Sequence, residues 1–496
     1  MRFDRILTRF PRVSDTESTM KFNEIKSVHI IGVCGTLMGA FAAYLKRSGI
    51  AVTGSDQNVY PPMSDVLKDA GVRLFSGYAA ENLLSLPERP DLVVIGNVIG
   101  AVNPEARAAI DGGYAYTSLP EAMEKILLPE TRNLVVSGTH GKTTTSTMLA
   151  HILVKAGKNP NYFIGGVSKD LPFSFHLSSI APGNFFVLEG DEYDTAFWDK
   201  VPKFNHYLPD DVILTSVEYD HADIYPDFAA VVRAFEGLVG RIRAGGRMIA
   251  CFDYPVIREL VTQSRVPVLS YGSDAAGARF APADVKIGLG ETRFKILDSG
   301  KIVTELAIPV PGHHNVLNAL AVWIECRELG LSDEQISTGF KSFQGVRRRQ
   351  EERGEERGVL VIDDFAHHPT AVRETLRALK GRYQGRPLIA VFEPRSATSR
   401  RKVFQKEFVA AFKDADAVFI SSPYDQSKIP AADQFSSEQL VEDLNQNNVK
   451  TGIIQTVEEG VSLVAREARP GDVIAVLSNG GFGGFIPKLL NELKKT

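Results

Sequence analysis

The sequence predicts an α/β protein built from three consecutive domains. Strand-like and helix-like patterns alternate through three blocks of the chain, and no low-complexity segment or short-period repeat interrupts them. At 496 residues the chain is also longer than one hydrophobic core usually serves. Alternation of this kind is typical of stacked α/β layers. We expect a loose extension at residues 1–26, followed by domains at 27–128, 129–346 and 347–496.

The composition excludes several classes of protein. Its 44% hydrophobic and 23% charged residues are ordinary for a globular chain, and the formal net charge of -4 argues against a dedicated nucleic-acid binder. No segment approaches the roughly 18 apolar residues of a membrane span, and no signal peptide follows the start. The three cysteines are widely separated and suggest neither a disulfide framework nor a zinc site. We expect a cytoplasmic protein, a monomer or weak homodimer, with no nucleic-acid or membrane partner.

The first block begins with a strand that ends in a glycine turn. Gly32 and Gly35 lie in this turn, just before a helical pattern, and the next strand ends at Ser55 and Asp56. The arrangement resembles the fingerprint of a dinucleotide-binding Rossmann domain, but Cys34 stands where that fingerprint needs glycine. A Rossmann-like domain is therefore expected, with a diphosphate at the helix N-terminus rather than a nicotinamide cofactor.

The second block carries a glycine-rich loop between a strand pattern at 134–136 and a helical pattern at 143–155. In such a loop, backbone N–H groups converge on phosphate oxygens, a lysine adds positive charge and a hydroxyl ligates Mg²⁺. We assign the last two roles to Lys142 and Thr143. The general motif would need glycine in place of Val136, so this is a narrower signature of a P-loop ATPase-like domain. The loop residues are Gly138, Thr139, His140, Gly141, Lys142, Thr143 and Thr144.

Two later strands of this block end in polar side chains. Glu189 follows the apolar run 185–188, and His221 lies after the run 212–215. Because α/β sheets bind ligands at the carboxyl ends of their strands and Mg²⁺ prefers oxygen ligands, Glu189 is the expected metal ligand. A lone histidine is more often structural than catalytic. The position of His221 beside this edge nevertheless favours a functional role.

The remaining pattern completes the architecture. Alternation over 285–309 predicts a β-meander, and helices are expected at 315–329 and 333–343. The mixed-charge stretch Arg347–Gly358 is expected to be the hinge to the third block, or simply a solvated linker. The third block repeats strand and helix in a second Rossmann-like arrangement, with strands at 359–362, 388–391, 417–420 and 473–477.

Six motifs follow one another along the chain: Gly138-Thr-His-Gly-Lys-Thr-Thr, Glu189 with the acidic residues after it, Asp220-His221-x-Asp223, Gly312-x-His-Asn315-x-x-Asn318, Arg348-Arg349 and Asp363-Asp-Phe-Ala-His-His-Pro369. In this order they resemble the motifs of the Mur ligase family. The resemblance covers roughly residues 27–490. It implies an N-terminal UDP-binding domain, a central ATP-binding domain and a C-terminal domain for an amine substrate.

The resemblance also implies a reaction. ATP phosphorylates the lactyl carboxylate of UDP-N-acetylmuramate, after which a free amine attacks the acyl phosphate to leave an amide. Phosphoryl transfer of this sort depends on positioning and on neutralising charge at the γ-phosphate. By this resemblance Lys142 contacts the β- and γ-phosphates, Thr143 and Glu189 bind one Mg²⁺, and a neutral His221 binds a second.

Further site residues follow from the same resemblance. Asn315 and Asn318 would meet the adenine or ribose, although helix capping would also suit them. From the third domain, Arg349 would lie by the γ-phosphate and Asp364 near the ribose. Several relatives hold the second metal with a carbamylated lysine. Glu236 stands in its place here, and either supplies that carboxylate or has no role.

The two remaining substrates are assigned to the outer domains. Gly32, Gly35, Ser55 and Asp56 are expected to hold the UDP-sugar. The incoming peptide carries several carboxylates, so arginine is expected in its pocket. The candidates are His367, Arg395 and the loop Ser478–Gly484.

Five stretches favour the family members that join UDP-N-acetylmuramate to the tripeptide L-alanyl-γ-D-glutamyl-meso-diaminopimelate during wall recycling. Phe365 supports this choice, because members that add free L-alanine usually carry tyrosine there. Free L-alanine is the nearer alternative amine. A nucleotide-binding regulator without ligase activity is the farther one, and the intact Lys142, Thr143, Glu189 and His221 count against it. The five stretches are Cys34–Gly39, Asp56–Met63, Gly190–Phe197, Asp220–Ile224 and Ser478–Gly484.

Overall fold

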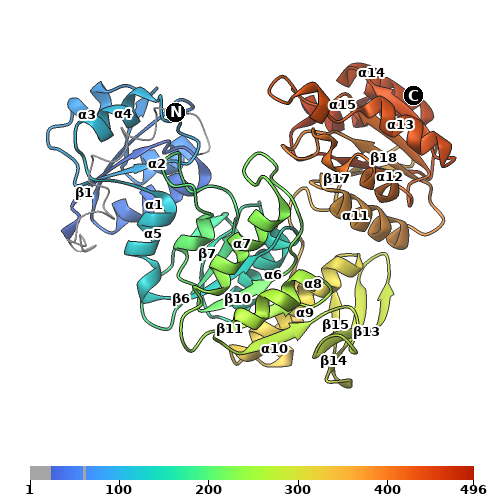
Figure 1. The fold of residues 1–496 in the computed structure, drawn as a ribbon, viewed down its shortest axis with the longest axis horizontal. Helices are drawn as coiled ribbons and strands as arrows, with labels where there is room; N and C mark the ends of the chain where they lie inside the picture. Colours follow the sequence, from blue (N-terminus) through green and yellow to red (C-terminus); the bar gives the residue numbers. More distant parts are fainter. Residues whose placement is uncertain (1–23, 60–62, 496) are drawn as a thin grey trace.

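The computed structural model describes residues 24–59 and 63–495. Figure 1 shows three α/β bodies in chain order, the first in blue, the second from teal to yellow and the third in orange and red. Each contains one sheet, so the predicted class of three α/β domains is confirmed. The strands of each sheet fall within the domain limits expected from the sequence, and those limits stay a prediction. Apart from residues 24–26, the expected N-terminal extension lies outside the described residues.

The N-terminal sheet is parallel, in the order β3-β2-β1-β4-β5. Strand β1 lies between β2 and β4, so the chain switches sides at its carboxyl end, where the glycine turn follows. This is the Rossmann-like arrangement that the glycine turn predicts. Its strands are β1 (Ser27–Ile31), β2 (Ala51–Asp56), β3 (Arg73–Ser76), β4 (Leu92–Ile95) and β5 (Tyr116–Ser118). Its helices are α1 (Thr36–Arg47), α2 (Met63–Asp69), α3 (Glu81–Leu84), α4 (Pro104–Asp111) and α5 (Leu119–Ile126).

The central sheet follows the order β15-β14-β13-β12-β11-β10-β6-β9-β7-β8. Strand β6 pairs in parallel with β9 on one side and with β10 on the other. The segments that follow these three strands therefore lie beside one another at the carboxyl ends of the strands. The expected meander forms β13, β14 and β15, an antiparallel extension of this sheet.

The strands of this domain are β6 (Arg132–Ser137), β7 (Asn161–Phe163), β8 (Phe175–His176), β9 (Phe185–Gly190), β10 (Asp211–Leu214), β11 (Arg247–Cys251), β12 (Val268–Tyr271), β13 (Phe280–Ile287), β14 (Thr292–Asp298) and β15 (Lys301–Ile308). Its α-helices are α6 (Lys142–Lys155), α7 (Phe228–Val239), α8 (Pro255–Leu260), α9 (His313–Glu328) and α10 (Asp333–Ser342). Short 3₁₀ turns occur at Leu128–Glu130, Lys203–His206 and Val261–Gln263.

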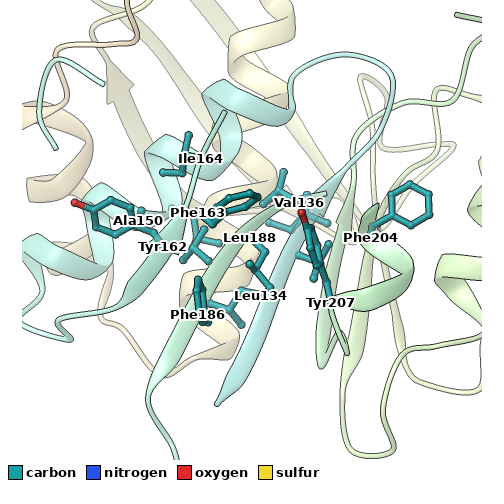
Figure 2. Close-up of a cluster of buried hydrophobic side chains, with 14 of the residues drawn as sticks. Leu134, Val136, Ala150, Tyr162, Phe163, Ile164, Phe186, Leu188, Phe204 and Tyr207 are labelled. Carbon is teal, nitrogen blue, oxygen red and sulfur yellow. The ribbon is translucent and has the colours of Figure 1, made fainter. Parts of the chain in front are cut away.

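A buried apolar cluster supports the central strands (Figure 2). Leu134 from β6 and Leu188 from β9 lie among the aromatic rings of Phe163, Phe186 and Tyr207. These side chains are almost fully buried, and the rings of Phe163 and Tyr207 meet edge to face with centroids 6.1 Å apart. Rigid packing of this kind holds the carboxyl ends of β6 and β9, and the polar segments that follow them, in fixed positions.

The C-terminal sheet has the order β16-β17-β21-β18-β19-β20, and β16 is its only antiparallel strand among the described residues. The strands are β16 (Glu351–Glu356), β17 (Val359–Asp364), β18 (Leu388–Phe392), β19 (Ala417–Ser421), β20 (Lys450–Ile454) and β21 (Val473–Leu477). The α-helices are α11 (Pro369–Arg382), α12 (Glu407–Ala411), α13 (Ser437–Gln446), α14 (Val457–Glu467) and α15 (Phe485–Lys495). Short 3₁₀ turns occur at Lys402–Phe404, Ala431–Asp433 and Phe482–Gly484.

The solvated-linker interpretation of residues 347–358 is wrong for residues 351–356, which form β16. This strand is rich in charge because it lies at the sheet edge, where charged residues discourage pairing with another chain. The residues just before β16 form backbone hydrogen bonds first with the central domain and then with the C-terminal domain. The amide of Arg347 donates to the Val167 carbonyl of the central domain at 2.8 Å, and the amide of Phe365 donates to the Arg348 carbonyl at 2.9 Å. The chain therefore crosses from the central to the C-terminal domain at Arg347 and Arg348, and the hinge expected there stays a prediction.

Helix α5 links the N-terminal domain to the central one through a histidine held between two carboxylates. The ring of His206 lies 2.6 Å from Glu124 Oε2 of α5 and 2.9 Å from Asp199 Oδ2 of the central domain. Burial alone would lower the pKa of His206, but Asp199 and Glu124 raise it to about 9. The folded protein therefore favours the imidazolium, whose two contacts hold α5 against the central domain.

We predict that His206→Gln lowers the free energy of unfolding by about 2 kcal/mol below pH 6.5 and by progressively less as the pH rises through about 9. The raised pKa means that the stabilisation is fully present below the unfolded pKa and is lost as the folded group deprotonates. Thermal unfolding of both proteins at pH 6 and pH 10 measures this. Lys200→Gln breaks an exposed pair with Asp194 and serves as the control, with a change near zero. An equal loss at both pH values would contradict the assignment.

Candidate active site

The phosphate loop connects β6 to α6 in a backbone conformation that its two glycines allow. Gly138 has φ +137 and Gly141 has φ +82, values that residues with a side chain rarely adopt. A Cβ at Gly141 would lie 2.7 Å from Asn318 Oδ1, so α9 packs directly on the loop. The loop is also held from the β10 side, where Ser216 Oγ accepts from the His140 amide at 2.8 Å. The first backbone N–H groups of α6 therefore lie near the carboxyl end of β6, where they form a site for an anion.

A hydroxyl and a carboxylate lie side by side beyond this loop. Thr143 Oγ1 donates to Glu189 Oε1 at 2.7 Å, and the Gly165 amide donates to the other carboxylate oxygen at 2.7 Å. Burial raises the pKa of Glu189, against the opposing effect of the Thr143 hydroxyl. A buried carboxylate and a hydroxyl are oxygen donors of the kind that Mg²⁺ prefers, and a cation there would favour the ionised acid. The pair expected from the sequence therefore fits a magnesium ion together with phosphate oxygens.

Glu192 joins two of the other predicted catalytic side chains, Lys142 and His221. Its Oε2 lies 2.8 Å from Lys142 Nζ, and its Oε1 lies 2.9 Å from His221 Nε2. Although burial opposes it, Lys142 and His221 lower the pKa of Glu192. In turn Glu192 raises the pKa of His221, whose burial alone would lower it. Glu192 thus draws the imidazole of His221 toward its protonated form in the ligand-free protein, whereas the expected ligand role would require the neutral ring.

Glu192 is the main residue of this site that the sequence reasoning missed. The acidic residues at the end of β9 and after it are visible in the sequence, but strand position favours the first of them, Glu189, which lies within β9. The backbone turns after Gly190, and the Tyr225 hydroxyl donates to the Glu192 carbonyl at 2.7 Å, which fixes the second carboxylate inside the site. Glu236, the carboxylate weighed for the second metal, lies instead on α7, where it accepts from Gln263 at 3.2 Å. It is not among the described residues that line the cavity.

Residues of α9 and of the C-terminal domain complete the site. Asn318 lies against the phosphate loop, and Asn315 donates to the Pro311 carbonyl at 2.7 Å. Arg349 stacks on the Phe365 ring at 4.7 Å from its centroid, and none of the described carboxylates forms an ion pair with it. Burial lowers the pKa of this guanidinium, so an anion beside it would be stabilising. Asp364 accepts from the Gln350 amide at 2.7 Å and from the Ala366 amide at 2.8 Å.

These residues surround one cavity of about 960 Å³ between the central and C-terminal domains. That volume is in the range of ligand sites in proteins. The sequence-predicted residues on its wall are Thr139, His140, Gly141, Lys142, Thr143, Thr144, Glu189, His221, Asn315, Asn318, Arg349, Asp364 and His367. The structure therefore brings together the catalytic, nucleotide and metal residues expected from separate motifs.

The expected UDP-sugar residues form a separate group in the N-terminal domain. The amides of Gly32 and Val33 donate to the Ser55 carbonyl at 2.8 and 3.0 Å, and Asp56 Oδ2 accepts from the Cys34 amide at 2.9 Å. These hydrogen bonds hold the glycine turn against the carboxyl end of β2. The Ser55 side chain is fully buried, so its carbonyl rather than its hydroxyl meets the turn.

The expected peptide residues are divided. His367 lies on the cavity wall, 3.7 Å from Asp220 Oδ2. Arg395 is not among the lining residues of the described chain, because its guanidinium stacks on Tyr424 at 3.9 Å and packs against Gly480. Another arginine holds the loop from the cavity side. Arg348 donates to the carbonyls of Ser478 and Gly480 at 2.6 and 2.7 Å.

Comparison with known proteins places this site in a family. The UDP-N-acetylmuramate--L-alanyl-gamma-D-glutamyl-meso-2,6-diaminoheptandioate ligase of Escherichia coli (strain K12) is 38% identical over 469 residues, which cover 94% of this chain and 98% of that protein. This chain belongs to the Mur ligase family. Family models match the catalytic domain over residues 27–130, the middle domain over 136–325 and the glutamate ligase domain over 348–480.

Two further comparisons agree. The UDP-N-acetylmuramate--L-alanine ligase of Chlorobium phaeobacteroides (strain BS1) is 32% identical, over 96% of this chain and 98% of that protein. The crystal structure of a murein peptide ligase from Psychrobacter arcticus 273-4 has a TM-score of 0.67 and 30% identity, and covers 95% of this chain and 99% of that chain. Mur ligases are ATP-dependent enzymes that form a C–N bond, so this chain is a ligase of that kind.

Two smaller findings concern membrane-spanning helices and the cysteines. Within residues 24–59 and 63–495, no helix combines the length and apolarity needed to cross a membrane. The three cysteines are free thiols, two of them buried, as expected from their spacing.

We predict that Glu192→Gln lowers the rate of ATP-dependent ligation by roughly 100-fold or more, because it removes the charge that positions both Lys142 and His221. Glu236→Gln is the matched control, since Glu236 lies outside the cavity, and its rate should stay within about twofold of the unsubstituted enzyme. Steady-state phosphate release measures both. A large loss in Glu236→Gln with little change in Glu192→Gln would reverse the two assignments.

Proposed function

We propose that this ligase joins UDP-N-acetylmuramate to L-alanyl-γ-D-glutamyl-meso-diaminopimelate, with ATP as the energy source, in the recycling of cell-wall peptides. The observation that carries the proposal is the convergence of Lys142, Glu189 and His221 with Arg349 on one cavity. Phosphate-binding, metal-binding and anion-binding groups then face the same space. The substrate class rests on the 38% identity with the Escherichia coli ligase that bears these substrates in its name.

The residues of the cavity divide the chemistry between them. The ammonium of Lys142, oriented by the Gly138 carbonyl at 2.6 Å and by Glu192, meets the β- and γ-phosphates of ATP. The unpaired guanidinium of Arg349 approaches the γ-phosphate from the opposite domain. Both neutralise charge that develops as the phosphoryl group moves to the lactyl carboxylate. Asn315, Asn318 and Asp364 would orient the nucleoside.

Magnesium fits the oxygen donors of Thr143 and Glu189, and it would supply further charge neutralisation at the phosphates. His221 is our candidate ligand for a second ion, with Glu192 rather than Glu236 as the neighbouring carboxylate. The protein does little covalent work in this scheme. Its residues hold the carboxylate, the phosphate and the amine in line, and the two domains exclude the water that would hydrolyse an acyl phosphate.

Free L-alanine is the second candidate amine, because a relative of that name matches nearly the whole chain at 32% identity. Phe365 counts against it. Its ring carries both Arg348 and Arg349, with guanidinium carbons at 5.3 and 4.7 Å from the centroid. A tyrosine ring offers cations the same face, so Phe365 counts against L-alanine only through the family resemblance, in which members that add L-alanine usually carry tyrosine there.

The test is phosphate release from Mg·ATP with UDP-N-acetylmuramate and either the tripeptide or L-alanine as the amine. We expect turnover with the tripeptide and at least about tenfold lower kcat/KM with L-alanine. Mass spectrometry of the product confirms that an amide has formed. The reverse preference would assign the enzyme to L-alanine addition.

A variant identifies the active site in the same assay. Lys142→Ala should reduce turnover by roughly 100-fold or more, because the ammonium acts on the charge developing at the phosphates. Its circular dichroism spectrum should match that of the unsubstituted protein. Silence of the unsubstituted enzyme with both amines, while ATP still binds, would favour the nucleotide-binding regulator.

A further inference from the structure

His221 has a backbone conformation that residues other than glycine rarely adopt. Its φ is +55, in the left-handed region that residues with a Cβ adopt only when their surroundings enforce it. Its carbonyl accepts from the amides of Ile224 and Tyr225 at 2.8 and 2.9 Å. These bonds hold the residues after His221. The conformation also needs a constraint on the residues immediately beside it.

That constraint comes from the C-terminal domain. Thr398 Oγ1 donates to Asp220 Oδ1 at 2.6 Å and accepts from the Ala222 amide at 3.2 Å. Asp220 Oδ1 also accepts from the amide of His221 at 2.7 Å. One hydroxyl therefore clamps both chain neighbours of His221. Asp220 and Thr398 are 5% and 2% exposed, so water does not compete for these bonds.

The direction of the His221 side chain depends on this clamp. With the backbone left-handed, Nε2 reaches Glu192 Oε1 at 2.9 Å and the ring packs on Tyr193 with centroids 4.1 Å apart. A return to ordinary backbone angles would swing the ring away from Glu192. Because Thr398 belongs to the other domain, the clamp exists only while the two domains are in contact.

A second contact between the same domains acts elsewhere. Thr370 Oγ1 donates to Glu218 Oε1 at 3.0 Å, and Glu218 holds His140 of the phosphate loop at 2.8 Å. This contact is a matched comparison, because it also joins a threonine hydroxyl to a carboxylate of the segment after β10. Through Glu218 this contact acts on His140 of the phosphate loop, whereas the Thr398 contact acts on the turn at His221.

We propose that Thr398 is a positioning residue that sets the orientation of His221, so that contact between the central and C-terminal domains assembles this part of the active site. The kinetic part of the inference rests on the proposed ligase function. The structural part concerns the ligand-free protein and does not.

The structural experiment is hydrogen exchange on the full-length, ligand-free protein, read by mass spectrometry over a peptide that spans residues 218–225. Thr398→Val should speed exchange at the Ala222 amide by roughly tenfold or more, because its acceptor is gone. Thr398→Ser keeps the hydroxyl and should restore protection. Thr370→Val should leave the Ala222 amide as slow as in the unsubstituted protein.

The kinetic experiment separates the two contacts. Thr398→Val should lower kcat by roughly tenfold or more at saturating substrates, with the KM for ATP within about twofold, and Thr398→Ser should recover most of it. Thr370→Val should mainly raise the KM for ATP. Unchanged exchange and unchanged kcat in Thr398→Val would overturn the inference, as would identical kinetic profiles for the two valine variants. Failure of the ligase assay in the unsubstituted enzyme would overturn the proposed function alone, because the exchange result is independent of it.

Discussion

The active site depends on a single buried carboxylate that contacts both a lysine and a histidine. Glu192 lies 2.8 Å from Lys142 and 2.9 Å from His221, and it is nearly inaccessible to solvent. A buried acid is costly unless it is paired and hydrogen-bonded, so the site is stable only while both partners are in place. ATP, and metal ions where they bind, would bring opposing charges of their own. Substrate binding would then exchange partners within a charge network that is already assembled in the ligand-free protein.

The order of strands explains why this network can form. Strand β6 is flanked by β9 and β10, so three segments distant in sequence leave the sheet beside one another. The phosphate loop brings Lys142, the β9 segment brings Glu189 and Glu192, and the β10 segment brings His221. The buried apolar cluster packed against these strands holds their carboxyl ends in fixed positions. The sheet thus brings the functional segments together, and contacts made by Tyr225 and Thr398 set the final directions of Glu192 and His221.

The sequence predicted most of the fold because its signals were local. The apolar runs that became β6, β9 and β10, and the glycines of the phosphate loop, each report on a few neighbouring residues. Lys142, Thr143 and Glu189 were found in the same way, since each lies within or shortly after an apolar strand pattern. Glu192 could not be separated from its acidic neighbours, because only the turn after Gly190 and the hydroxyl of Tyr225 direct it inward. The role of Thr398 was equally hidden, since its partners lie 178 and 176 residues away in the chain.

The change of partners at Arg347 and Arg348 has a mechanical meaning. A rigid body that turns about a point displaces its parts in proportion to their distance from that point. Arg349 is the next residue along the chain, so rotation of the C-terminal domain carries its backbone through only a short arc. Thr398 lies on a separate loop of that domain, after β18, and contacts the chain neighbours of His221. If the C-terminal domain turned about the crossover, Arg349 would therefore keep its place beside the cavity, and the turn at His221 would lose the Thr398 hydroxyl.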